Sequence, residues 1–210
     1  ARDRSPIVFS PAVSSRSLAL LALASLVLGA AIRGPIVLGV DFPLNDGGLF
    51  LAFIEKILAD GFAFPDFVDW NGYRVPFAYP PLSFYALAGL ARATGIEPLK
   101  LVQYVPLVVN LVSVPVFVCV AARLLPGASA LFFAAVAFPI LPRSYEWLVM
   151  GGGVSRSPAM LATLIALLLT MEAIDRRRKS LLVAATVVLG IVLALHLEWG
   201  ISGWVATTLV

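Results

Sequence analysis

The chain has 210 residues, of which 60% are hydrophobic and 13% are charged, and its mean hydropathy is +0.98. Soluble domains have roughly 45–50% apolar and 25% charged residues, so this composition excludes an ordinary soluble domain and indicates a membrane protein. The 15 basic and 12 acidic residues give a net charge of +3. The basic residues lie at the ends of apolar runs, as membrane orientation requires, which argues against nucleic acid as a partner.

Five apolar runs predict an all-α fold, a polytopic transmembrane bundle that forms a single domain. A bilayer needs about 20 apolar residues per span. We expect spans at residues 17–40, 99–122, 128–141, 158–174 and 180–197, and the start of another at 200–210. The polar side chains of Gln103 and Asn110, inside the second run, are expected to bond to neighbouring helices. Because the sequence begins at an alanine and stops in an apolar stretch, we expect the N-terminal half of a longer protein.

The segment between the first two runs, residues 40–85, is only half apolar and carries six acidic residues. Asn45-Asp46-Gly47 predicts a turn. Residues 48–60 then place apolar side chains at helical spacing, which predicts an amphipathic helix lying on the membrane surface. Residues 80–93 open with two prolines, a good helix start, but their apolar run is too short for a span, which favours a second interfacial helix.

The distribution of basic residues predicts the orientation. Arginines precede the first run, and its outer end is expected at Arg33-Gly34-Pro35. If residues 80–93 do not cross, Arg123 and the basic cluster at 176–179 lie on the same side as the N-terminus, which the positive-inside rule makes cytoplasmic. The long first loop is then extracytoplasmic in a multi-pass plasma-membrane protein. A signal peptide is the alternative for the first run, and the later spans disfavour it.

Two carboxylates are candidates for catalysis in the loops that this orientation places outside. Asp46 could act as a general base that takes a proton from an acceptor hydroxyl, or could simply cap the helix that follows it. Glu146 could be a second catalytic carboxylate or could pair with Arg143. Together Asp46 and Glu146 could also hold a divalent cation, Mg²⁺ or Mn²⁺.

Candidate phosphate contacts lie in two further loops. Ser157 and Pro158, after three glycines, predict a helix N-terminus that favours an anion, and Arg156 adds a forked donor. The alternative is a flexible link with a surface arginine. His196 and Glu198 cannot share a helix face, so we expect the helix to break there. His196 could bind phosphate or move a proton, or could lie at the interface beside a tryptophan.

Four motifs together resemble the GT-C superfamily of membrane glycosyltransferases, which includes protein mannosyltransferases and aminoarabinose transferases. The motifs are NDGGLF after the first run, FAYPPLSFY, GGGVSRSPAM before a later run, and LHLEWG after another. The resemblance implies inverting transfer of a sugar from a polyprenyl-phosphate-linked donor, at the outer face, to a polysaccharide, lipid or protein acceptor.

The resemblance also implies roles for particular residues. Asp46 matches the family's base and Glu146 its second-loop acid, while Arg156 and His196 match donor-phosphate contacts. We add Arg74 as a further phosphate contact, and Tyr79 and Glu198 as substrate contacts. Two other classes of function stay open: a transporter or flippase-like protein, with intramembrane Asn, Pro and Gly along a path, and a non-catalytic membrane assembly subunit.

Overall fold

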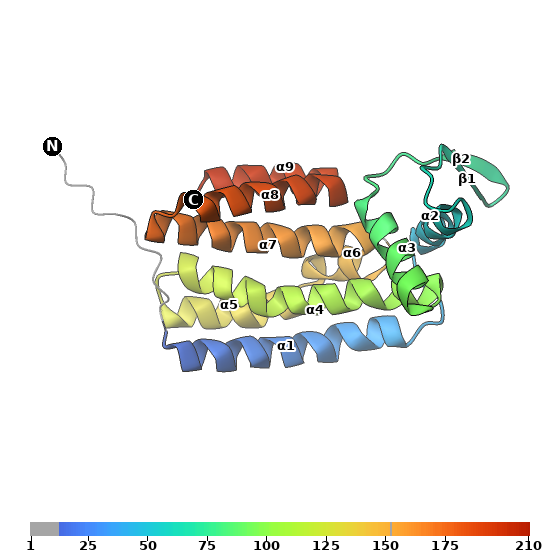
Figure 1. The fold of residues 1–210 in the computed structure, drawn as a ribbon. Coiled ribbons are helices and arrows are strands. Elements are labelled where there is room, and N and C mark those ends of the chain that lie inside the picture. The colour runs from blue at the N-terminus through green and yellow to red at the C-terminus, as the bar shows by residue number, and fades with distance from the viewer. Residues whose placement is uncertain (1–12, 152) are drawn as a thin grey trace.

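The computed structural model describes residues 13–151 and 153–210, and these residues are mostly helical (Figure 1). An up-and-down bundle is formed by helices α1 (Ser15–Leu38), α4 (Pro98–Leu124), α5 (Ala128–Ile140), α7 (Gly153–Arg176), α8 (Lys179–Leu195) and α9 (Leu197–Thr208). Among the described residues, α1, α4 and α7 are long and apolar enough to cross a membrane. Helix α5 has 13 residues and α8 has 17, so both are shorter than the length of a full span.

The remaining elements gather at one end of the bundle, which we call the cap end. They are α2 (Gly47–Ala59), β1 (Phe67–Trp70), β2 (Tyr73–Pro76) and α3 (Leu82–Thr94), with η1 (Pro142–Ser144) and α6 (Glu146–Val149) beside them. Helix α3 lies across this end and does not run among the long helices (Figure 1). The turns that join α4 to α5 and α7 to α8 lie at the opposite end, which we call the basic end.

Helix α2 buries its apolar face inside the protein. Phe50, Phe53, Ile54 and Ile57 are at most 2% exposed and pack in one cluster with Phe84 of α3. Rings of α2 and α3 meet edge to face, with Phe53 and Phe84 centroids 5.3 Å apart. The prediction that this face rests on lipid was therefore wrong, because helical periodicity shows that one face is buried but not what covers it.

A two-stranded antiparallel hairpin stands out from the cap end, and the all-α prediction missed it. Strands β1 and β2 pair with Trp70 opposite Tyr73. Asn71 and Gly72 between them have φ angles of 52° and 78°. These positive angles define the type I′ turn, for which Asn-Gly is a preferred sequence, so this dipeptide was the signal for the hairpin.

Arg33 lies inside the bundle, so the prediction that it marks the outer end of the first span was wrong. Helix α1 continues to Leu38, and the Arg33 side chain is fully buried. Its guanidinium donates to Asn110 Oδ1 (2.7 Å), Phe138 O (3.1 Å) and Ser144 Oγ (3.0 Å). It also lies over the ring of Tyr145 at 5.2 Å. Arg33 therefore ties α1 to α4 and to the 77° bend that follows α5.

Gln103 of α4 forms hydrogen bonds with the C-terminal end of α1. Its Nε2 donates to the carbonyl oxygens of Val37 (3.1 Å) and Val40 (2.5 Å), which lie at and beyond the end of α1. The last carbonyls of a helix lack intrahelical partners, so Gln103 supplies the missing donor. The prediction that Gln103 and Asn110 bond to neighbouring helices is confirmed.

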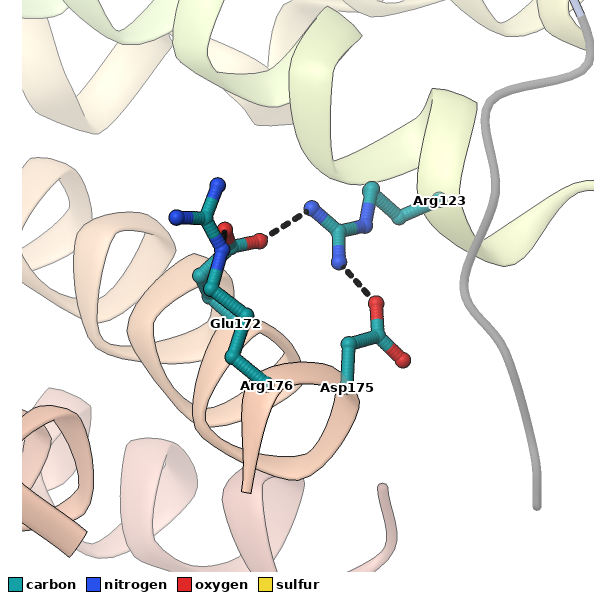
Figure 2. A network of polar contacts seen from close by, with 4 residues as sticks. All are labelled: Arg123, Glu172, Asp175 and Arg176. Atoms are coloured by element: carbon teal, nitrogen blue, oxygen red, sulfur yellow. Dashed lines mark hydrogen bonds and ion pairs between the residues drawn. The ribbon is translucent and has the colours of Figure 1, made fainter. Parts of the chain in front are cut away.

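The basic end is joined by a network of ion pairs between α4 and α7 (Figure 2). Arg123 donates through one nitrogen to Glu172 at 2.8 Å and through the other to Asp175. Arg176 pairs with the second oxygen of Glu172 one helical turn away. Both acidic residues are thus neutralised within the protein.

Candidate functional site

Helix α7 begins at Gly153, five residues before the predicted first helical residue Pro158, so the interpretation of Ser157 and Pro158 as a helix N-terminus was wrong. The Ser157 hydroxyl is buried and donates to Leu148 O in α6. Gly153 N donates to Met150 O at 2.7 Å. A Cβ atom on Gly153 would lie 2.0 Å from Leu148 O, so the glycine allows the first turn of α7 to pack against α6.

Gly151 brings the backbone of the glycine-rich loop before α7 into contact with the turn before α2. Its N–H donates to Leu44 O at 2.9 Å. A Cβ atom at this position would lie 2.1 Å from the backbone nitrogen of Gly47, a distance at which atoms overlap. The Asp46 turn therefore packs directly against the glycine-rich loop. This contact accounts for Gly151 without a bound anion.

A cavity of about 640 Å³ opens at the cap end between α6, the start of α7 and α9. We call it the arginine pocket, and it is lined by Arg143, Trp147, Leu148, Arg156, Glu198, Trp199 and Ser202. The guanidinium of Arg156 lies over the Trp147 ring at 5.7 Å, and its Nε donates to His196 Nε2 at 3.3 Å. The pocket thus combines two cations and one carboxylate with two indole rings.

His196 stands at the break between α8 and α9, with extended backbone angles, as the sequence predicted. Its side chain is 7% exposed, and its Nδ1 is buried without a hydrogen-bond partner in the described part of the chain. Burial lowers the pKa of His196, the nearby charge of Arg156 lowers it further, and Glu198 raises it. The neutral imidazole is therefore favoured near pH 7, and its Nε2 can accept the hydrogen bond from Arg156.

Tyr79 lies next to His196, whereas Arg74 lies elsewhere. The rings of Tyr79 and His196 have centroids 6.3 Å apart, and Tyr79 also contacts Phe50 and Phe84. Arg74 stacks on Phe67 at 4.4 Å in the hairpin. It lines a separate depression of about 550 Å³ with Lys56 and several aspartates. Of the predicted phosphate contacts, the structure brings Arg156 and His196 together and leaves Arg74 apart.

Neither predicted catalytic acid lines the arginine pocket. Asp46 is half-buried at the position before α2 and makes no side-chain capping bond, so the simple capping role is not seen. Glu146 is exposed at the start of α6, and the described residues include no ion pair between it and Arg143.

No group of three His, Cys, Asp or Glu side chains occurs as a metal-binding set within residues 13–151 and 153–210. Among the described residues, the predicted Mg²⁺ or Mn²⁺ site therefore has Asp46 and Glu146 as its proposed donors and no third carboxylate or imidazole in a metal-binding group. Such hard cations take six or more oxygen ligands, so most would have to come from water or substrate.

Sequence reasoning missed the two indole rings and Ser202 of the pocket. Trp199 and Ser202 are three residues apart on α9 and therefore share a helix face with Glu198 close by. That spacing was a usable signal. Trp147 reaches the same cavity because α6 packs against α7. Local residue spacing does not predict this packing.

Comparisons of the chain with protein-family models, with curated proteins and with solved structures find no match. The resemblance to GT-C glycosyltransferases therefore stands on the four sequence motifs.

Proposed function

We propose that the chain is a membrane glycosyltransferase that binds a polyprenyl-phosphate-linked sugar at the cap end. The arginine pocket is the observation that supports this proposal. Guanidinium groups bind phosphate with two parallel hydrogen bonds, and Arg143 and Arg156 both line the cavity. Trp147 and Trp199 add flat apolar faces on which a sugar ring or the first isoprene unit can pack. The rest of the lipid tail can lie along the apolar helices that run from the cap end toward the basic end.

The chemistry is a single displacement. The acceptor oxygen forms a bond to the anomeric carbon while the bond from that carbon to the phosphate oxygen breaks, and the configuration inverts. Lipid phosphate leaves with the electron pair, and the arginines stabilise its negative charge as it departs. Neutral His196 accepts from Arg156 Nε, which leaves the other guanidinium nitrogens to face the phosphate.

A carboxylate must take the acceptor's proton as the new bond forms. We propose Asp46 for this role, since its turn contacts the glycine-rich loop through Gly47 and Gly151. Glu198 is the alternative general base, because it lines the arginine pocket. The two assignments predict different mutants to be inactive.

The test incubates the full chain in vesicles with polyprenyl-phosphate sugars and measures released lipid phosphate and donor binding separately. Asp46→Asn should abolish transfer while donor binding stays near normal. Arg156→Gln should weaken donor binding, whereas Arg92→Gln, an exposed arginine on α3, should not. An active Asp46→Asn combined with an inactive Glu198→Gln would transfer the base role to Glu198. Passage of a solute into the vesicles without any released lipid phosphate would support a transporter instead.

We further propose that the cap end is extracytoplasmic and the basic end cytoplasmic, as the positive-inside rule requires. Figure 1 shows α3 and the α7–α8 turn at opposite ends of the bundle. Single cysteines at positions 92 and 178, in a background with Cys119→Ala, should react with a membrane-impermeant label from opposite sides. Labelling of both from one side would overturn the topology, and with it an extracytoplasmic transferase site.

A further inference from the structure

A second hollow lies at the basic end, where α7 turns into α8. Its volume is about 300 Å³, and it is lined by Ala173, Ile174, Arg177, Arg178, Lys179 and Leu182. Arg177 has a φ angle of 50°, the left-handed conformation that side chains other than glycine and asparagine rarely adopt. This turn places three consecutive cations around one cavity.

The three cations form no ion pair with a residue of the described ranges, 13–151 and 153–210. The acidic residues nearest in sequence are Glu172 and Asp175, and these bind Arg123 and Arg176 (Figure 2). No ion pair in the described ranges involves Arg177, Arg178 or Lys179, and all three are exposed. The described residues therefore give this hollow a positive charge that no ion pair among them neutralises.

The other half of the hollow is apolar and continues along the bundle. Ile174 is 42% exposed and Leu182 is 52% exposed, although both are large aliphatic residues. Val183, the next residue on α8, is 62% exposed. A soluble anion would gain nothing from these side chains, whereas an amphiphile could pack its chains on them. The ligand that fits has an anionic head and a hydrocarbon tail.

We infer that this hollow binds the headgroup of an anionic phospholipid, with its acyl chains along the exposed faces of α7 and α8. Basic pockets between helices at a membrane surface recognise lipid phosphates in this way. General attraction of basic loops to a charged membrane needs no cavity and has no fixed stoichiometry. The site described here holds one lipid at one place, and it is independent of the glycosyltransferase proposal.

The test measures binding of phosphatidylglycerol to the full chain in detergent by native mass spectrometry, with phosphatidylcholine as the neutral comparison. One phosphatidylglycerol should bind saturably. In the variant Arg177→Gln/Arg178→Gln/Lys179→Gln the affinity should fall roughly a hundredfold, since each basic residue near an anionic surface contributes about a factor of five. The matched control, Arg16→Gln/Arg92→Gln/Lys100→Gln, loses the same charge outside the hollow and should bind normally.

Two further variants separate charge from folding. Arg177→Lys/Arg178→Lys keeps the charge and should retain most of the affinity. Arg177→Asn suits the left-handed turn and should weaken binding severalfold even if the triple variant does not fold. Equal loss in the triple variant and in its control would reduce the effect to bulk charge and overturn the site. Displacement of the lipid by millimolar inorganic phosphate would identify a soluble-anion site and overturn the lipid assignment.

Discussion

The contact between Gly151 and Gly47 gives the sharpest test of how the cap end is assembled. In Gly151→Ala the new methyl carbon would lie 2.1 Å from Gly47 N and 2.8 Å from Leu44 O. Ordinary contact begins near 3.4 Å, so the start of α2 must move by roughly 1.3 Å. Both obstructing groups are backbone, which cannot rotate away. Overpacking of this kind costs about 1–3 kcal/mol, and we expect the free energy of unfolding to fall by that amount.

The matched control is Gly89→Ala in α3, at the same end of the molecule. A Cβ atom on Gly89 meets nothing within 4 Å, so alanine should stabilise this helix by up to about 1 kcal/mol. Unfolding of both variants in detergent gives the comparison. A displacement of 1 Å at a reacting group can lower a rate about a hundredfold, so sugar transfer should also fall in Gly151→Ala if Asp46 is the base. Equal stability of the wild type and Gly151→Ala would refute the packing argument.

Two further predictions concern buried polar groups. Arg33→Met should lower the free energy of unfolding by about 2–4 kcal/mol, because Asn110 Oδ1 and the Phe138 carbonyl in the last turn of α5 lose their donor. Exposed Arg92→Met should change it little, and equal unfolding curves for Arg33→Met and the wild type would contradict this reasoning. The folded-state pKa of His196 lies below its ordinary value, so the unfolded chain binds the proton more readily and stability should fall as the pH drops below about 6.5. Unfolding measured at pH 7.5 and 5.5 checks the slope, which His196→Gln should remove because the chain has a single histidine.

Local patterns predicted the helical elements well. The turn at Asn45-Asp46-Gly47, the ends of α2 and the break at His196 all occur where side-chain chemistry and spacing indicated. These features depend on a few neighbouring residues. The hairpin is equally local, because the Asn71-Gly72 turn that joins its strands is a two-residue signal.

The rest depends on contacts between distant segments. The buried position of Arg33 requires acceptors from α4 and from the bend after α5, which no periodicity reveals. The glycine-rich loop looked like an anion cradle, yet Gly151 and Gly153 serve close packing against Gly47 and Leu148. The sequence predicted both Arg74 and Arg156 as phosphate ligands. The fold places Arg156 in the arginine pocket and Arg74 in a different depression.

The partners of Arg33 have a consequence for synthesis of the chain. Within the described part of the chain, the hydrogen-bond acceptors of this side chain are encoded 77 to 111 residues later. At roughly 5–20 residues per second, the ribosome makes them about 4–22 s after α1. During that interval the guanidinium lacks these acceptors, and burying an unpaired arginine in the hydrocarbon is unfavourable. The cost is at most about 2.5–3.5 kcal/mol, the value for an arginine at a helix centre, because Arg33 lies five residues before the end of α1. Helix α1 should therefore stay near the translocon or the bilayer surface until α5 emerges, and its stable insertion is a late step.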